Sequence, residues 1–418
     1  MSSLLFCFAR KKCYLCSHNY LLMTMNLMKK LIAAVMAVMP FVTVAEEVAE
    51  PVETPKRSLS VSVSTLNTSD SAIMATKPQE GEKPVMPLNI HIGPSKLTLF
   101  GYAQTQFDIT KTGAETKNSF SLTRIILMAN AELTRKLSFF LMVDAASTQA
   151  SKHLHEYYAQ YAFLPELKVR VGQFKTPYTL ENIISPTLLG TVNLNEGTRY
   201  MAGIAGDALY GNYAGRDLGA MITGDAVRAR DGHYYINYSV GVFNGAGMNL
   251  RDNNKHKDVV AMLNVLPTKD ITLSGSFVIG KGNAQDDDMF GTIAKGDNYT
   301  RNRWSVGAEV KWRPLKLRTE YMSGKNGGIG SRAFYAELWC RLFRNLDVVL
   351  DYDYLDKNTA LSKEARDAFP AWTRTSNYLV GLQYWVYKKC RISTQYIYSD
   401  RNMGPDTKAW ITQFQIGF

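Results

Sequence analysis

Basic side chains are the residues of this 418-residue chain whose types and spacing could do chemistry. Most of them recur in short segments with an alternating, strand-like pattern, where they stand on the polar face. Positive charges that line a narrow, poorly screened passage attract anions and influence which ions pass. The candidates for such an anion-binding constriction are Arg124, Arg170, Lys175, Arg199 and Arg318.

The same polar faces also carry acids, and these allow a second interpretation. Further basic residues are Arg303, Lys311, Arg313, Lys316, Arg341 and Arg391. The acids that alternate with them are Asp144, Glu156, Glu309, Glu320, Glu337, Asp347, Asp351 and Asp353. Opposite charges on neighbouring strands pair across a sheet, so each single arginine is also explained as a paired wall residue. Only as a set would these residues form an electrostatic filter.

Two other kinds of chemistry have less support in this sequence. His153 and His155 lie near Asp144 and Ser151, the one arrangement that resembles a hydrolase set. Histidines beside serine in a loop are more often solvated turn residues. Neither these histidines nor the Cys13-x-x-Cys16 pair is accompanied by further ligands at zinc spacing. We therefore predict no catalytic residue, no metal site and no cofactor.

The stretch from Leu167 to Asn182 organises the rest of the chain. Its first part, LKVRVGQFK, alternates two valines with Lys168 and Arg170, as expected of a strand with two unlike faces. Pro177 then removes a ladder donor, and about forty residues with repeated Gly, Asn and Pro precede the next strand pattern. A loop of this length is normally functional or disordered, and its tyrosines and basic residues are not a disordered composition.

The run from Arg170 to Glu181 resembles the R-x-G-Q-F-K-x-P-[FY]-x-x-E stretch of the phosphate-selective porin O and P family of outer-membrane channels. The resemblance implies that the loop after it folds inward and narrows the pore, that Lys175 belongs to the constriction and that the subunits form a trimer. It also matches Arg124 to a position where relatives often carry adjacent arginines. Here the neighbours are Thr123 and Ile125, so we expect phosphate to be one permeant anion among several.

From Leu97 onward the chain consists of segments of about ten residues that alternate in polarity and are separated by turn residues. Sixteen candidate strands begin near Leu97, Phe120, Leu137, Leu154, Val169, Asp217, Tyr234, Asp258, Ile271, Arg303, Leu315, Ala333, Leu346, Asn377, Cys390 and Lys408. An even strand number at roughly twenty residues per strand and connection is typical of bacterial outer-membrane barrels. We expect an all-β fold, a transmembrane antiparallel β-barrel of about 16 strands over residues 96–418, with an infolded constriction loop, short periplasmic turns and longer outer loops.

Two strands indicate which face meets lipid. Between Trp304 and Trp312 the even positions are aromatic or aliphatic, whereas the odd positions are Ser, Gly, Glu and Lys. The strand from Trp410 to Phe418 repeats this pattern, with two glutamines on the opposite face. Aromatic residues at both ends of an apolar stripe are typical of membrane interfaces. A soluble β-sandwich also alternates, but sixteen strands and an export signal favour the barrel, whose closure leaves no sheet edge in lipid.

The first 95 residues have the composition of an export signal and a lead-in segment. Lys29 and Lys30 precede an apolar run over 31–44 that is too short for a membrane helix and is followed by Ala45, as in a secretory signal. We assign 1–24 to an upstream extension, 25–45 to a signal peptide and 46–95 to a flexible periplasmic segment. Five basic and no acidic residues precede Glu46, so cleavage lowers the net charge from +11 to +6, which does not indicate a nucleic-acid partner.

The expected function is passive diffusion of small hydrophilic solutes with a lean toward anions such as phosphate, and no enzymatic activity. The alternative is an outer-membrane surface receptor or adhesin that uses the external loops. Expected partners are outer-membrane lipid and lipopolysaccharide, the latter contacted through the acidic run 286–288, and the assembly machinery, which would recognise the strand ending at Phe418. We expect a homotrimer in the bacterial outer membrane after cleavage near Ala45.

Overall fold

A computed structural model describes residues 59–62, 88–92, 95–149, 152–207, 209–211, 213–288, 292–362, 372, 374–402 and 404–418. All of them belong to one compact unit, Arg57–Phe418. The expected upstream extension and signal peptide lie outside the described residues, as does most of the segment 46–95. No helix within the described ranges is long and apolar enough to cross a membrane.

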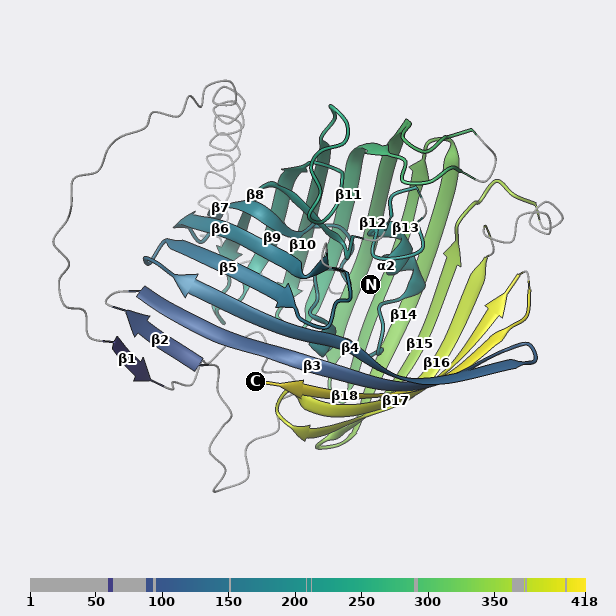
Figure 1. Ribbon diagram of the computed structural model, residues 1–418. Helices are drawn as coiled ribbons and strands as arrows, with labels where there is room; N and C mark the ends of the chain where they lie inside the picture. Colours follow the sequence, from purple (N-terminus) through teal and green to yellow (C-terminus); the bar gives the residue numbers. More distant parts are fainter. Residues whose placement is uncertain are drawn as a thin grey trace, which may run out of the picture. The chain divides into compact units, whose positions relative to one another are not determined.

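Antiparallel strands make up almost all the regular secondary structure of the described residues (Figure 1). The first nine are β1 (Leu59–Ser62), β2 (Leu88–Ile92), β3 (Ser95–Thr112), β4 (Glu115–Glu132), β5 (Leu137–Asp144), β6 (Leu154–Leu164), β7 (Leu167–Lys175), β8 (Arg216–Arg228) and β9 (Tyr234–Phe243). The others are β10 (Asp258–Thr268), β11 (Ile271–Asn283), β12 (Asn298–Trp312), β13 (Leu315–Asn326), β14 (Ile329–Phe343), β15 (Leu346–Asp356), β16 (Thr375–Tyr387), β17 (Cys390–Arg401) and β18 (Thr407–Gly417). Two short helices, η2 (Pro186–Leu188) and α2 (Glu196–Met201), lie between β7 and β8.

Strands β3 to β18 form a closed barrel of sixteen strands. Each strand pairs with the next, and β18 closes the sheet on β3, with Gly417 opposite Tyr102 and Thr407 opposite Thr112. The predicted all-β barrel is confirmed, and every predicted strand start lies inside one of these strands. The prediction succeeded because a sheet with one lipid face and one lumen face imposes a period of two on the sequence.

Strand β2 prolongs the wall beyond the end of β18. One edge of β3 pairs with two strands in turn. Residues 95–99 pair with β2, with Leu99 opposite Leu88, and the residues from Tyr102 onward pair with β18. Pairing therefore begins before residue 96, in the segment expected to be flexible. Leu88, Asn89 and Ile90 do alternate in polarity, but the segment is too short and too close to prolines to stand out in the sequence.

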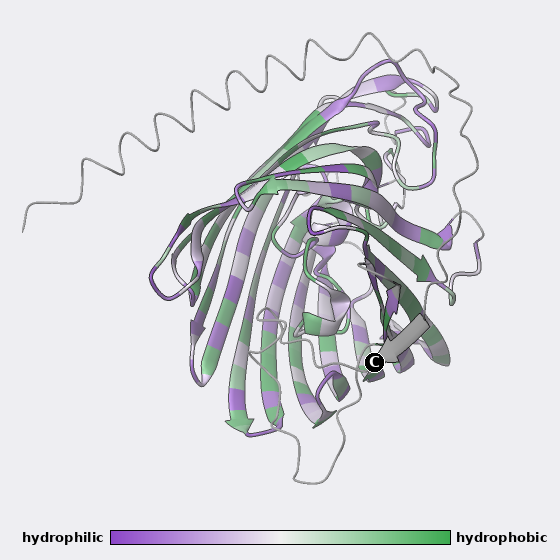
Figure 2. Cartoon of the chain, turned by 90° about the vertical axis from the view of Figure 1, so that its left-hand side faces the viewer, coloured by the Kyte–Doolittle hydropathy of each residue, from purple (hydrophilic) through white to green (hydrophobic). Residues whose placement is uncertain are grey.

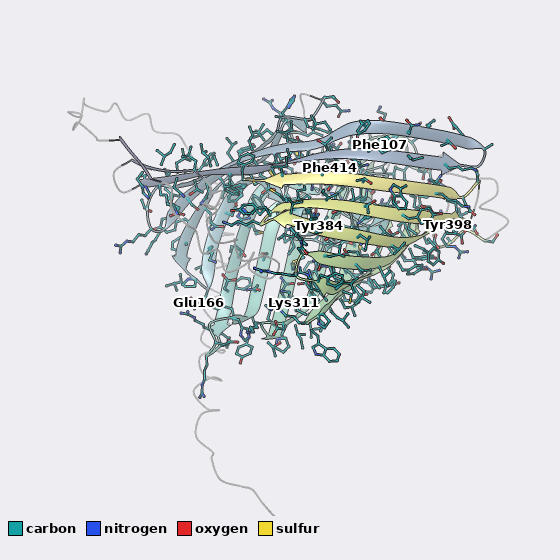
Figure 3. The ribbon with its side chains drawn as sticks, turned by 90° about the horizontal axis from the view of Figure 1, so that it is seen from below. Phe107, Glu166, Lys311, Tyr384, Tyr398 and Phe414 are labelled. Atoms are coloured by element: carbon teal, nitrogen blue, oxygen red, sulfur yellow. The ribbon has the colours of Figure 1, made fainter. Side chains whose placement is uncertain are left out.

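The outer face of the barrel is apolar and the inner face is polar, which Figure 2 shows as alternating bands along the strands. On β12, Trp304 is 47% exposed while the next residue, Ser305, is buried. On β18, Phe414 is exposed while Gln413 is buried, and Phe414 lies near Phe107 of the adjacent strand β3 (Figure 3). The outward side chains can therefore meet lipid, as the sequence predicted for β12 and β18.

The main cluster of buried apolar residues lies between the wall and the loop that connects β7 to β8. Tyr178, Tyr200 and Met201 of this loop pack in one cluster with wall residues from β7 to β15. The wall members of the cluster are Phe174, Met221, Phe243, Val260, Val278, Met322, Ala333, Tyr335 and Leu355. The core of this barrel therefore exists because the loop turns inward and packs against the wall.

Candidate functional site: a loop folded across the lumen

The connection from Thr176 to Gly215 crosses to the far wall of the barrel. The backbone N–H of Leu180 donates to Glu320 Oε1 on β13 at 2.8 Å, and that of Val192 donates to Gln395 Oε1 on β17 at 2.9 Å. Helix α2 packs against β13, β14 and β15. These strands are remote in strand order from β7 and β8, where the loop starts and ends. The loop is therefore infolded, as the family resemblance implied.

The residues of the central motif hold the base of this loop together. Lys175 Nζ donates to the carbonyl oxygens of Asn182 at 2.6 Å and Ile184 at 2.8 Å. Asn182 Nδ2 donates to the carbonyls of Thr176 and Gly215, both at 3.2 Å. The loop's first and last residues are thereby tied to one side chain. The motif thus stabilises the base of the loop, and its lysine takes part in these bonds.

Glu181, the last residue of the motif, acts inside the fold of the loop. It is fully buried and accepts hydrogen bonds from the backbone N–H of Asn195 at 3.2 Å and from Asn195 Nδ2 at 3.1 Å. Burial and, after it, the nearby Glu337 raise the pKa of the Glu181 carboxyl to about 8. Because Asn195 immediately precedes α2, Glu181 fixes the start of that helix.

Buried arginines of the wall attach to the loop from the other side. Arg303 donates through Nη1 to the carbonyl of Met201 and through Nη2 to Asp207 Oδ2 at 2.5 Å and Asn326 Oδ1 at 2.7 Å. Arg391 Nη1 donates to the carbonyl of Leu189 at 2.7 Å. Such charge-assisted bonds to carboxylate and carbonyl oxygens are stronger than neutral ones, so these side chains anchor the loop.

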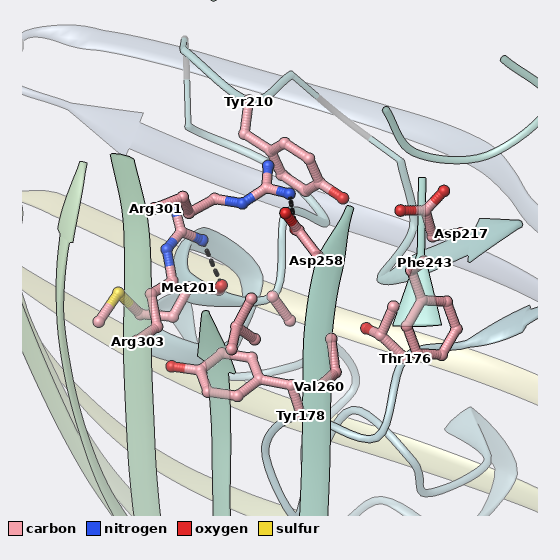
Figure 4. Close-up of a pocket in the computed structure, with 12 residues that line it drawn as sticks. Thr176, Tyr178, Met201, Tyr210, Asp217, Phe243, Asp258, Val260, Arg301 and Arg303 are labelled. Carbon is pink, nitrogen blue, oxygen red and sulfur yellow. Dashed lines mark hydrogen bonds and ion pairs between the residues drawn. The ribbon is translucent and has the colours of Figure 1, made fainter. Parts of the chain in front are cut away.

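A small pocket, partly open to solvent, lies between the loop and strands β8 to β12 (Figure 4). Arg301 pairs there with Asp258, and its guanidinium lies 3.7 Å from the centre of the Tyr210 ring. Tyr178 from the loop and Asp217 from β8 complete the polar part of the lining. Sequence reasoning missed Arg301, although the alternation of β12 places it on the same face as Arg303.

Three of the five predicted constriction residues bond only neutral oxygens. Arg124 Nη1 donates to Gln104 Oε1 at 2.8 Å, and Arg170 Nη2 donates to Gln160 Oε1 at 2.8 Å. Lys175, as described above, donates to backbone carbonyls. Each of the three side chains is only partly buried. Their positive charges therefore stay without a carboxylate partner inside the barrel.

The other two predicted residues are paired with acids. Arg199 in α2 bonds Glu196 at 2.8 Å. Arg318 on β13 is fully buried and bonds Glu309 at 2.8 Å and Glu337 at 3.5 Å. A cation that contacts a carboxylate contributes little net charge at longer distance. For these two positions the structure therefore favours the interpretation as paired residues.

The structure brings some of the predicted residues together. Arg124 interacts electrostatically with Arg199 and with Arg216, and Lys175 interacts with Arg124 and Arg216. Arg216 bonds Glu156 Oε1 at 2.7 Å; the sequence does not single it out, because the alternating pattern begins near Asp217. These charges are close enough to interact, and the acids Asp144 and Glu156 interact with the same residues.

Arg170 and Arg318 have other surroundings. Arg170 stacks on the ring of Tyr158, and Arg318 lies among the acids of β12 and β14. The five predicted positions therefore do not form a single cluster.

The acids of the far wall are covered by the loop. Glu320, Glu337, Asp351 and Asp353 are all buried, and the loop bonds Glu320 and lies directly beside Glu337. At Gly190 the approach is so close that an added Cβ would lie 2.0 Å from Glu337 Oε1. These carboxylates thus face the loop more than the open lumen.

Asp144, one of the residues considered for a hydrolase site, stabilises the barrel wall. Asp144 Oδ1 accepts from the backbone N–H groups of Ile125 at 3.2 Å and Ala146 at 3.0 Å, which ties the end of β5 to β4. His155 Nε2 lies 3.9 Å from the other oxygen of Asp144. Ser151, which would be the nucleophile, lies outside the described residues.

A closed barrel of sixteen strands with an apolar exterior, a polar interior and a loop folded across its lumen defines an outer-membrane porin. The family model of the phosphate-selective porin O and P matches residues 98–415. The chain belongs to this family, which confirms the resemblance found in the motif around Lys175. No curated protein sequence matches the chain significantly.

Solved structures with the same fold are distant in sequence. The anion-selective porin from Comamonas acidovorans is 13% identical with a TM-score of 0.57, and the match covers 78% of this chain and 100% of that one. The outer-membrane channel DcaP of Acinetobacter baumannii is 11% identical with a TM-score of 0.53, over 77% and 97%. A trimer form of OmpT from Vibrio cholerae is 12% identical with a TM-score of 0.52, over 77% and 99%.

Proposed function

We propose that this porin allows passive diffusion of small hydrophilic solutes with a weak preference for anions, that phosphate is one permeant among several, and that the protein is not an enzyme. The supporting observation is the difference between two sets of charges. Arg124, Arg170 and Lys175 bond neutral oxygens and have no carboxylate bonded to them. The carboxylates of Glu337 and its neighbours on the far wall are buried beneath the loop.

Coulomb's law sets the size of the expected preference. At an effective dielectric constant of about 20, one unit charge roughly 5 Å from an anion is worth on the order of 3 kcal/mol before the cost of desolvating the ion. A few uncompensated cations therefore suffice for a modest preference. The acid partners of Arg199 and Arg318, and the absence of a second arginine beside Arg124, argue against tight phosphate binding.

Reversal potentials of purified protein in a planar bilayer under a salt gradient test the proposal. The wild type is expected to be weakly anion-selective, and Lys175→Glu to shift the reversal potential toward cation selectivity. Arg124→Glu should act in the same direction without loosening the loop base. Lys295→Glu, an exposed substitution in an outer loop, is the matched control. A cation-selective wild type, or two variants without effect, would contradict the proposal, and absence of stepwise conductance would favour the receptor alternative.

We further propose that the protein is a homotrimer, and an unpaired edge of β4 supports this. Residues 126–132 of β4 pair with β5, but 115–124 pair only with β3 among the described strands. Phe120 on this part of β4 is 77% exposed, and its ring centroid lies 4.6 Å from that of Phe107. Lipid cannot satisfy the N–H and C=O groups of an open edge, whereas a second subunit can cover it. The trimer form of the similar OmpT structure is consistent with this proposal.

Cross-linking in mild detergent tests the trimer. We expect a trimeric product for the wild type, less of it for Phe120→Ser and an unchanged amount for Val306→Ser, which alters an equally apolar exposed position on β12. Recovery of monomer alone from the wild type would contradict the trimer. Equal effects of the two substitutions would show that the β4 edge is not the contact.

A further inference from the structure

Five inward-facing aromatic rings form a continuous row across the wall from β3 to β9. The distances between ring centroids are 6.5 Å from Phe100 to Phe140, 5.2 Å from Phe140 to Tyr158, 5.8 Å from Tyr158 to Phe174 and 5.4 Å from Phe174 to Phe243. The last two rings are buried in the core beneath the loop, whereas the first three are only partly buried. Phe100, Phe140 and Tyr158 thus form an aromatic strip that faces the lumen.

The strip is on the inner face of the wall, because neighbours in its own strands point to known lumenal partners. Glu156, two residues before Tyr158, bonds Arg216, and Met142, two residues after Phe140, also contacts Arg216. Phe139, the next residue to Phe140, is exposed on the outer face. Side chains alternate along a strand, so Phe140 and Tyr158 point inward.

Arg170 adds a positive charge to this strip. Its guanidinium carbon lies 4.1 Å from the centre of the Tyr158 ring and 5.4 Å from that of Phe174. Nε and Nη2 both donate to Gln160 Oε1, at 3.1 and 2.8 Å. Within the described ranges Nη1 has no hydrogen-bond partner, and the only acceptor that Arg170 contacts is neutral. Stacking on Tyr158 holds the guanidinium plane in place, so that an anion meets a preoriented donor.

A ring-bearing anion could use both features at once, whereas an inorganic anion uses only the guanidinium. A carboxylate would accept from Arg170, and an attached flat ring would pack against the partly exposed rings of the strip. Aromatic pairs of this kind gain about 0.5–1.5 kcal/mol beyond the burial of their area. The strip adjoins Phe174 and Phe243, which pack in the same cluster as Tyr178 and Tyr200 of the loop, so it lies beside the constriction loop.

We propose that Phe100, Phe140, Tyr158 and Arg170 form a binding subsite for aromatic carboxylates on the solute path, beside the constriction loop. This subsite rests on the proposed anion-conducting function and goes beyond it by naming a class of solute that the channel favours over aliphatic and inorganic anions.

Block of the chloride current through single channels tests the subsite, with benzoate as the probe and butyrate as an aliphatic carboxylate of the same charge. Benzoate is expected to half-block the wild type at a lower concentration than butyrate. In Tyr158→Leu the half-blocking concentration of benzoate should rise about two- to tenfold, the fold-change that corresponds to the loss of an aromatic pair. The half-blocking concentration of butyrate should stay the same. Arg170→Gln should raise both values.

Two further variants separate the ring from general effects on the barrel. Tyr158→Phe keeps the ring and is expected to keep the benzoate preference, and Phe139→Leu removes an aromatic side chain from the outer face of the same wall and should change neither value. Equal half-blocking concentrations for benzoate and butyrate in the wild type would overturn the subsite, and so would an unchanged benzoate value in Tyr158→Leu. A cation-selective or non-conducting wild type would contradict the proposed function and the subsite together, whereas an anion-selective channel that ignores the ring contradicts the subsite alone.

Discussion

The two sides of the lumen use arginine for different purposes. On the wall from β4 to β7, Arg124 and Arg170 are partly buried and bond glutamine side chains. On the wall from β12 to β17, Arg303 and Arg391 are buried and bond the backbone of the infolded loop. All four lie on the inner face of similar strands. The partner that a guanidinium finds, more than its position in the strand pattern, decides whether it acts on passing ions or on the fold.

The difference has an energetic reason. Burying a guanidinium costs free energy that hydrogen bonds and a nearby carboxylate offset, and for Arg303 Asn326 supplies an acceptor and Asp207 supplies the carboxylate. A guanidinium that borders water keeps its solvation and its field, and it can bind a solute without breaking contacts of the fold. Anchoring residues and ion-binding residues should therefore respond differently to substitution.

The largest effect is expected for Arg303→Met, which leaves Asp207 buried without its cation. Breaking one partner of a buried pair typically costs about 3–5 kcal/mol. We expect the temperature at which the folded barrel converts to the unfolded form on denaturing gels to fall, and the single-channel current to become larger and noisier as the loop leaves the wall. Arg313→Met, at an exposed turn, should leave both quantities unchanged. A quiet channel of normal size in Arg303→Met would show that Arg303 does not anchor the loop.

A somewhat smaller effect is expected for Gly190→Ala, which tests the cover over the acidic wall. The added methyl group would meet Glu337 Oε1 at 2.0 Å and the Trp339 ring at 2.3 Å, so the loop must shift. Overpacking of this kind costs about 1–3 kcal/mol. Uncovering the carboxylates should also reduce the anion preference in reversal-potential measurements. Gly328→Ala is the matched control, because nothing lies within 4 Å of its added Cβ.

Glu181 should make the attachment of the loop depend on pH. Its pKa is raised from an ordinary value of 4.5 to about 8, so the folded loop favours the protonated carboxyl. The contribution of that carboxyl to stability is complete below about pH 4.5 and is lost as the pH rises through about 8. Proteolysis of the loop should therefore accelerate over this range in the wild type. Glu181→Gln, which stays neutral, should lack the acceleration, whereas Glu196→Gln, at a partly exposed position, should retain it.

The smallest effect is expected where a lumenal cation is already compensated. Arg199 and Glu196 form a partly exposed pair, and such pairs contribute about 0–1 kcal/mol to stability. The double variant Arg199→Gln with Glu196→Gln removes no net charge, so its reversal potential should match that of the wild type. Arg124→Gln removes one uncompensated charge and should shift the reversal potential. An equal shift in the two variants would remove the distinction between paired and unpaired cations.

The fold could be predicted from the sequence because its signal is local. Each strand carries its own alternation, and the long stretch after Lys175 lacks one, so the strands and the single large loop were recognisable without knowledge of their neighbours. The ends of the strands are harder to locate from the sequence. Arg216 and Arg301 lie at or beyond the boundaries that alternation suggested, and both turned out to be buried residues of the loop surroundings.

The roles within the site could not be predicted in the same way. Arg391 bonds the carbonyl of Leu189, roughly two hundred residues away in sequence, and its own strand gives no indication of this contact. Arg318 and Arg170 look alike in the sequence, since each alternates with apolar residues. They differ because one faces Glu309 and Glu337 and the other faces Gln160 and Tyr158. The role of each of these arginines can be assigned only when its partners across the barrel and the path of the loop are known.

The seam between β3 and β18 has a consequence for the order of folding. It joins residues as far apart as Gln104 and Gln415, whose side chains bond at 2.9 Å across a sequence separation of 311 residues. Pairings of such high contact order form slowly, while β2 reaches the same edge of β3 through a short connection. During refolding, β2 should therefore occupy its part of that edge early and mark where β18 has to stop. Pulsed hydrogen exchange should show protection at Leu99 before protection at Thr105, and simultaneous protection would exclude this order.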